Sequence, residues 1–167
     1  MPIDNPNLVT RSATVQDTPV IFALLRGLAE YEQLVSDFVV TESDLTQSLF
    51  GPDPIANVIL AYDGDKAVGL AVFCQRYSTF LGRQYLYLED IFVVLSHRGS
   101  GIGRKLMEQA ALLAQTLGST MIEWSVLNWN EPAIKFYEHL GAKPVDGWKT
   151  YRLSGQELNQ LANPRQT

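Results

Sequence analysis

The segment 94–110, VLSHRGSGIGRKLMEQA, joins an apolar, strand-like stretch to an amphipathic helix through a loop with three glycines. The unpaired N–H groups and the dipole of a helix N-terminus favour anions, and glycines let an anion approach the backbone. Arg98, Arg104 and Lys105 add local positive charge to a chain whose net charge is −5. The segment therefore predicts an anion site in an acidic protein.

Several glycine motifs bind anions in this way, and two of them fit poorly. A phosphate-binding P-loop needs a glycine directly before Lys105, where Arg104 stands. The dinucleotide motif G-x-G-x-x-G fails as well, because its third glycine falls at Arg104, although Glu123 lies about 20 residues further on, as that motif requires. A nicotinamide enzyme therefore remains an alternative. The pattern R-x-x-G-x-G over 98–103 remains open beside a plain glycine-rich turn.

The composition is that of an ordinary globular protein, with 46% hydrophobic and 19% charged residues. The length of 167 residues predicts one domain over 8–162, with a flexible N-terminus at 1–7 and a flexible tail at 163–167. No apolar run approaches a membrane span, so we expect a cytoplasmic protein that does not contact membranes. The acidic charge argues against nucleic-acid binding and suits a cationic substrate. The single cysteine, Cys74, lies in an apolar run and is expected to be a buried core thiol.

Hydrophobic periodicity predicts alternating strands and helices, and capping signals mark helix ends: a capping box at Thr41 and Asp44, an N-cap at Asn130 and a C-terminal glycine at Gly118. In chain order we expect strand 8–13, helix 17–32, helix 41–50, strands 57–62, 66–76 and 85–94, a helix from the glycine loop to Gly118, strand 121–127, helix 130–141 and strand 150–153. A hairpin turn is expected at 63–65 and a loop at 78–83. This order predicts a mixed α/β fold with a mostly antiparallel sheet and helices on its faces.

Three segments together resemble one family. They are LAEYEQL at 28–34, YLEDIFVVLSHRGSGIGRKLM at 87–107 and SVLNWNEPAIKFYEHLGA at 125–142. In combination they closely resemble the GCN5-related N-acetyltransferases (GNAT), within them the spermidine/spermine and thialysine branch. The resemblance implies the GNAT fold, in which a splayed pair of strands holds acetyl-CoA. It also implies a homodimer that transfers acetyl to a primary amine of a small cationic acceptor.

The resemblance implies which residues hold the cofactor. The glycine loop holds the pyrophosphate of acetyl-CoA, the backbone of the preceding strand pairs with the pantetheine arm, and Asn130 hydrogen-bonds the cofactor from the following helix. The implied cofactor-binding residues are Ile91, Phe92, Val93, Arg98, Gly99, Ser100, Gly101, Ile102, Gly103, Arg104, Asn130, Pro132 and Ala133.

Acetyl transfer requires the acceptor amine to lose a proton, because an alkylammonium has a pKa near ~10. By resemblance Glu89 is the general base, acting through a water. We expect Asp90 to point to the opposite face of the strand, since neighbouring strand residues alternate. Burial among Tyr85, Tyr87 and Ile91 is expected to raise the pKa of Glu89. A structural ion pair, or a charge that only attracts the cation, is the alternative role.

Tyr137 is the candidate general acid for the departing thiolate. Asn130, Ile134, Tyr137 and Gly141 share one helix face, so a cofactor that contacts Asn130 can also approach Tyr137. The alternative is a tyrosine that packs its ring against the sheet.

The resemblance also implies an acceptor pocket lined by Tyr31, Glu32, Glu89, Glu123, Trp124 and Ser125. Polyamine-acetylating members typically carry an acidic residue in the loop that here reads RYSTFLG, which has Ser78 and Thr79 instead. This difference favours a thialysine-like acceptor over a polyamine. A protein or peptide acetyltransferase and a non-catalytic acyl-CoA-binding module are the alternative functions. His97 and His139 have no partners at metal-ligand spacing, so no metal site is expected.

Overall fold

The computed structural model describes residues 7–164 and divides into two compact units, residues 1–127 and 128–167, which we describe separately. Of the segments expected to be flexible, residues 1–6 and 165–167 lie outside the described part. The single domain over 8–162 stays a prediction.

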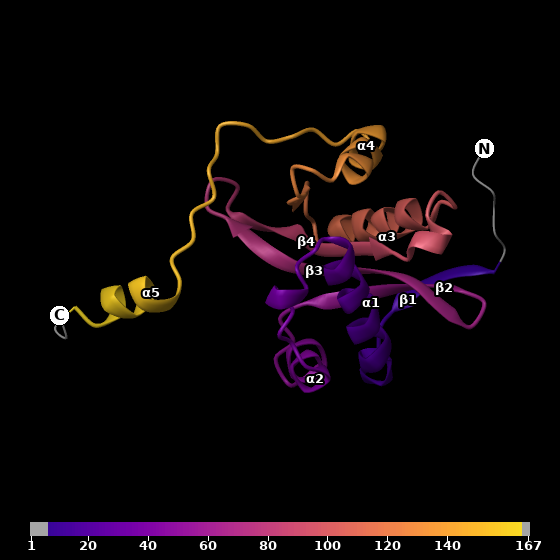
Figure 1. Cartoon of the computed structure of the whole chain (residues 1–167). Coiled ribbons are helices and arrows are strands. Elements are labelled where there is room, and N and C mark those ends of the chain that lie inside the picture. The colour runs from indigo at the N-terminus through magenta and orange to yellow at the C-terminus, as the bar shows by residue number, and fades with distance from the viewer. Residues whose placement is uncertain (1–6, 165–167) are drawn as a thin grey trace. The chain divides into compact units, whose positions relative to one another are not determined.

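A five-stranded sheet forms the centre of the first unit (Figure 1). The strands lie side by side in chain order: β1 Leu8–Ser12, β2 Asn57–Asp63, β3 Lys66–Ser78, β4 Arg83–Val93 and β5 Ile122–Trp124. All neighbouring pairs are antiparallel except β4 and β5, which are parallel. The predicted mixed α/β fold with a mostly antiparallel sheet is confirmed.

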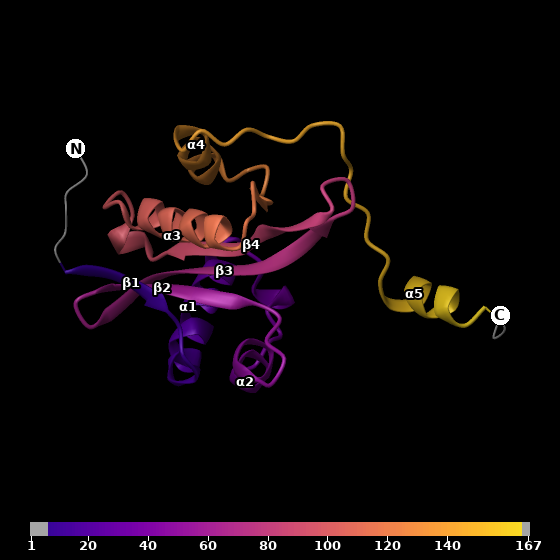
Figure 2. The same ribbon diagram turned by 180° about the vertical axis from the view of Figure 1, so that it is seen from behind.

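Helices cover both faces of this sheet. Figures 1 and 2 show α1 (Thr18–Tyr31) and α2 (Glu42–Phe50) on one face and α3 (Ile102–Thr116) on the other. Apolar side chains of α1 and α2 pack with those of β2, β3 and Phe92 into one buried core. The capping box predicted before α2 is present, because Thr41 and Asp44 exchange hydrogen bonds of 2.9 and 3.1 Å.

A β-bulge interrupts β4 at Glu89. Val72 on β3 faces Asp90, but the next residue, Phe73, faces Leu88, so Glu89 is an extra residue in the ladder. The alternation predicted along this strand is therefore wrong beyond Glu89, because Ile91 lies on the face opposite to that of Tyr85 and Tyr87.

The parallel pairing of β4 with β5 is short. It joins Leu86, Tyr87 and Leu88 to Ile122, Glu123 and Trp124. Within the described residues β4 continues to Val93 without a strand partner on that side. The two strands thus separate at the end that leads into the glycine loop. The strand predicted at 121–127 is shorter because only three of its residues find ladder partners.

The second unit contains α4 (Glu131–His139) and α5 (Gly155–Ala162). Asn130 caps α4 as predicted, since its side-chain oxygen accepts the N–H of Ala133 at 3.4 Å. The strand predicted at 150–153 is wrong: these residues are irregular and exposed, and no strand of the described chain pairs with them. The sequence prediction missed α5.

No helix among residues 7–164 is long and apolar enough to cross a membrane.

Candidate active site

The glycine loop needs glycine for its backbone conformation. Gly99 has φ +76° and Gly101 has φ +85°, values that other residues adopt only at a cost. A Cβ at either position would meet nothing within 4 Å, so lack of space is not the reason. Gly101 directly precedes α3, and no side chain caps this helix end.

The first turn of α3 is suited to an anion. It contains no acidic residue, and it carries Arg104 and Lys105, which repel the positive end of the helix dipole. Arg104 is paired with Glu108 through Nε and Oε1 at 2.9 Å, one turn further along the same helix. A bound anion would relieve this repulsion and accept hydrogen bonds from the free N–H groups of the helix.

Arg98 connects the glycine loop to the rest of the first unit through three contacts. Its Nε donates a 3.0 Å hydrogen bond to the carbonyl of Val93, at the end of β4. Its guanidinium lies 4.1 Å from the ring centre of Tyr31, the last residue of α1, and 5.7 Å from that of Phe92. One residue predicted to bind the cofactor is thus in contact with one predicted to line the acceptor pocket.

Three carboxylates gather where α1 ends beside the bulge. They are Glu32, Glu89 and Asp90, and the charges of the first two both act on Asp90. Burial, together with the neighbouring charges of Glu32 and Glu89, raises the pKa of Asp90 to about 6. Burial also raises the pKa of Glu32. Glu89 itself is exposed, so the burial expected around Glu89 occurs at Asp90 instead.

The bulge places both strand carboxylates on one side of the sheet. Val72 and Cys74 are two residues apart on β3 and share a face, which their partners Asp90 and Tyr87 on β4 also share. Glu89 reaches the same face, because its Oε1 lies 3.5 Å from the Sγ of Cys74. The expectation that Glu89 and Asp90 point apart is therefore wrong.

Cys74 is half-buried rather than a core thiol, which corrects the sequence prediction. Burial raises its pKa, and the hydrogen bond to Glu89 raises it further. The thiol therefore stays protonated at neutral pH and acts as a hydrogen-bond donor to the candidate base.

The residues predicted to line the acceptor pocket on the sheet come from β4, from β5 and from the segment after it, and β3 lies next to β4. The Tyr87 hydroxyl lies 3.1 Å from Oγ of Ser125, just after β5. Burial raises the pKa of Tyr85, Glu123 raises it further and Arg76 lowers it, so this tyrosine lies between opposite charges. The guanidinium of Arg76 lies 3.2 Å from the ring centre of Tyr87.

Sequence reasoning missed Asp90 and Arg76 as site residues. Strand alternation predicts the opposite face for Asp90, because the bulge is a property of strand pairing that the segment itself does not reveal. Arg76 follows Cys74 by two residues, and strand alternation is the signal that places it on the same face.

The other predicted residues, Asn130, Pro132, Ala133 and Tyr137, belong to the second unit. Tyr137 is buried, and its ring centre lies 5.3 Å from that of Phe136.

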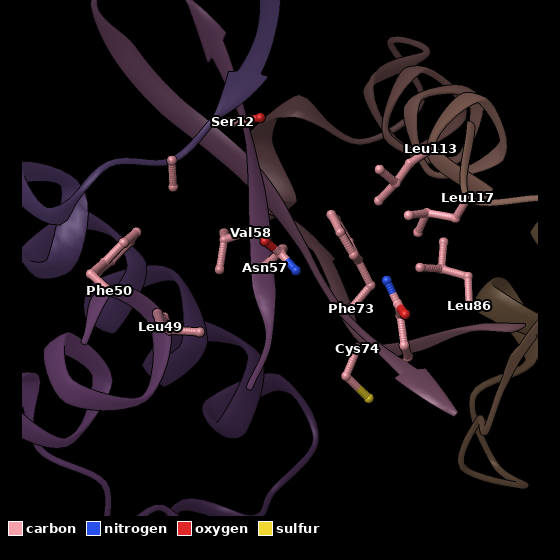
Figure 3. A pocket seen from close by; sticks show the side chains of 12 residues that line it. Ser12, Leu49, Phe50, Asn57, Val58, Phe73, Cys74, Leu86, Leu113 and Leu117 are labelled. Atoms are coloured by element: carbon pink, nitrogen blue, oxygen red, sulfur yellow. The ribbon is translucent and has the colours of Figure 1, made fainter. Parts of the chain in front are cut away.

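A pocket of about 410 Å³ lies elsewhere, around the start of β2 (Figure 3). Figure 3 shows Leu49 and Phe50 of α2 on one side of the strands, and Leu113 of α3 with Leu117, which directly follows α3, on the other. None of its lining residues belongs to the glycine loop, and of the acidic site it shares only Cys74. We therefore base the site on the glycine loop and the carboxylates.

No group of three or more metal-ligating side chains occurs in the part of the chain that the structure describes.

Comparison with known proteins connects this geometry to a family. The model of the Acetyltransferase (GNAT) family matches residues 25–142. The thialysine N-epsilon-acetyltransferase of Bos taurus is 34% identical, over 93% of this chain and 97% of its own. A Homo sapiens spermidine/spermine N(1)-acetyltransferase-like protein 1 is 29% identical, over 91% of this chain but 23% of its own.

A solved structure with the same fold is an integron cassette protein from the mobile metagenome of V. cholerae. It has a TM-score of 0.79 and 28% identity, and the match covers 93% of this chain and 98% of the other. Family enzymes use acetyl-CoA as their cosubstrate, which agrees with the anion site before α3. The chain therefore belongs to the acetyltransferase (GNAT) family and is an acetyl-CoA-dependent amine acetyltransferase.

Proposed function

We propose that this enzyme transfers acetyl from acetyl-CoA directly to a primary amine of a small cationic acceptor, thialysine-like or of the diamine and polyamine type. Glu89 is the general base and Tyr137 the general acid. The observation that supports this most is the bulge in β4. It places Glu89 and Asp90 on one face, where the charge of Glu32 at the end of α1 also acts on Asp90, and β4 continues from there as an edge without a partner from β5.

The residues present fit acetyl-CoA. The N–H groups of residues 99–104 suit a pyrophosphate, and the basic first turn of α3 adds positive charge. The backbone of Ile91–Val93 has no partner from β5, and an extended pantetheine arm pairs with such an edge as an added strand does. When bound, acetyl-CoA supplies an activated thioester carbonyl for the amine to attack.

The carboxylates bind the acceptor ammonium and take its proton. Glu89 is exposed and receives the proton through a water, while Glu32 and Asp90 supply negative charge next to it. Because the pKa of Asp90 is about 6, the negative charge of the cluster increases as the pH rises past this value. Activity is therefore expected to rise between pH 5 and pH 7.

Tyr137 donates a proton to the departing thiolate. Support comes from the segment NWNEPAIKFYEHLGA that resembles the family, in which Tyr137 follows the Asn130 cap by two helical turns. We expect Tyr137→Phe to lower kcat by about 10²-fold, the usual size of acid catalysis. An unchanged kcat would remove Tyr137 from the mechanism.

The experiment that tests the proposed function is CoA release from acetyl-CoA across an acceptor panel of thialysine, lysine, putrescine, spermidine, spermine and a lysine peptide. Saturating turnover of one small amine supports the proposal. Preferential turnover of the peptide favours a protein acetyltransferase. Acetyl-CoA binding without any turnover favours a non-catalytic acyl-CoA-binding module.

We further propose that the enzyme is a cytoplasmic homodimer, which rests on resemblance and composition alone. Light scattering after size-exclusion chromatography gives the oligomeric state, and a molar mass near 18.6 kDa would contradict a dimer.

A further inference from the structure

We propose that Arg76 is a specificity-determining residue that binds the carboxylate of the acceptor. The preferred acceptor is then an α-amino acid with a terminal amine rather than a diamine or polyamine. The inference rests on the proposed function and deepens it, because it names the substrate class of the same site.

Arg76 lies on the face of the sheet that carries the candidate base. It follows Cys74 by two residues on β3, and Cys74 contacts Glu89. Its guanidinium stacks 3.2 Å from the ring centre of Tyr87, whose hydroxyl contacts Ser125. A guanidinium stacked on a ring keeps its N–H groups at the rim, where they can form two parallel hydrogen bonds with a carboxylate.

The site has a negative end and a positive end. Both charges act on Cys74, because that of Glu89 raises the pKa of the thiol and that of Arg76 lowers it. Cys74, whose thiol contacts Glu89, and Arg76 are two residues apart on β3, a distance of about 7 Å along the strand. An extended lysine-like amino acid separates its terminal amine from its carboxylate by a similar length. A diamine instead presents a cation at both ends and would place one beside Arg76.

Arg76 is available for such a ligand. It is exposed, and in the described chain no carboxylate oxygen lies within 4.0 Å of its side-chain nitrogens, unlike Arg11, Arg26 and Arg104. Glu123 on β5 lies near Arg76, since both act on the pKa of Tyr85, which Glu123 raises and Arg76 lowers. An α-amino acid carries an ammonium beside its carboxylate, and Glu123 is placed to attract it.

The test compares L-lysine with cadaverine, which differ only in the carboxylate. CoA release at saturating acetyl-CoA gives kcat and KM for the wild type, Arg76→Gln and Arg76→Lys. Lys66→Gln removes a positive charge from the other end of β3 and is the matched control. We expect Arg76→Gln to raise the KM for lysine about tenfold, the loss of a charged hydrogen bond, with kcat little changed. The KM for cadaverine should stay the same or fall, and Arg76→Lys should recover part of the lysine affinity.

Lysine methyl ester provides a second test that needs no variant. Its carboxylate is neutralised, so the wild type should bind it as weakly as Arg76→Gln binds lysine. If Arg76→Gln raises the KM for lysine and for cadaverine by the same factor, the assignment of Arg76 is wrong. It is also wrong if the wild type uses lysine methyl ester as well as lysine. Wild-type turnover of diamines or polyamines but of no amino acid would contradict this inference and leave the proposed function intact. Turnover of no amine at all would contradict both.

Discussion

The thiol of Cys74 on β3 donates a hydrogen bond to the carboxylate of Glu89 on β4, with Sγ and Oε1 3.5 Å apart. The bond holds a residue that the bulge removes from regular pairing, so the candidate base depends on a neighbouring strand for its orientation. Because burial and Glu89 both raise the pKa of Cys74, the donor keeps its proton at the pH at which the enzyme works.

Replacing this donor should weaken catalysis slightly. A long, partly exposed hydrogen bond contributes about 0.5–1 kcal/mol, so we expect Cys74→Ala to lower kcat/KM about two- to fivefold. Cys74→Ser keeps a donor and should stay close to the wild type. Steady-state kinetics with a saturating acceptor gives both values. Equal kinetics for Cys74→Ala and the wild type would mean that the contact does not orient Glu89.

The carboxyl of Asp90 should make stability depend on pH. Its pKa rises from 3.8 to about 6 on folding, so its contribution to stability is full below pH 3.8 and is lost as the pH rises through 6. Asp90→Asn avoids this loss. The difference in the free energy of unfolding between the variant and the wild type should therefore shift by about 2 kcal/mol in favour of the variant from pH 4 to pH 8.

Urea unfolding at the two pH values measures this difference. Asp65→Asn, in the exposed turn between β2 and β3, is the control and should show no such gain. A wild-type-like pH response of Asp90→Asn would show that Asp90 ionises in the folded protein as freely as in the unfolded chain.

Gly101→Ala should weaken acetyl-CoA binding. The substitution strains a backbone with φ +85° at the start of α3, which costs about 1–2 kcal/mol and displaces the N–H groups offered to the pyrophosphate. We expect the KM for acetyl-CoA to rise about tenfold or more. Gly64→Ala has comparable strain at φ +58° in the β2–β3 turn and should leave this KM unchanged. If both variants gave the same KM, the loop would not bind the cofactor.

Gly69→Ala should destabilise the fold by about 1–3 kcal/mol, as overpacking does. Its Cβ would lie 2.9 Å from the carbonyl oxygen of Phe92, which the sheet holds in place, and 3.4 Å from Ile102 and Leu106 of α3. Gly27→Ala also approaches Phe92, at 3.1 Å, but meets the ring edge and gains helix propensity. The free energy of unfolding, measured with urea, should therefore be lower for Gly69→Ala than for Gly27→Ala. The reverse order would contradict this packing.

Local signals predicted the elements that they directly encode. The Thr41–Asp44 capping box, the Asn130 cap and the positive-φ glycine after α3 all depend on residues a few positions apart, and all are present. Residue patterning predicts a strand at 150–153, but a strand also needs a neighbour to accept its hydrogen bonds. The described chain provides none for that segment.

The chemistry of the site depended on longer-range pairing. Which of two adjacent carboxylates is buried follows from the register between β3 and β4 and from the approach of α1, which brings Glu32 to Asp90. Neither is visible in the segment YLED itself. The glycine loop, by contrast, depends on local residues, because its positive φ angles come from Gly99 and Gly101 and its charge from Arg98 and Arg104.

The bridge made by Arg98 has a thermodynamic consequence. The same side chain touches the Val93 carbonyl, at the strand edge that we propose pairs with acetyl-CoA, and the ring of Tyr31, which we propose lines the acceptor pocket. Any ligand that shifts Arg98 at one end changes the free energy of binding at the other. If acetyl-CoA tightens acceptor binding by some factor through this contact, the acceptor must tighten acetyl-CoA binding by the same factor. Cosubstrate and acceptor would then be bound as interdependent partners.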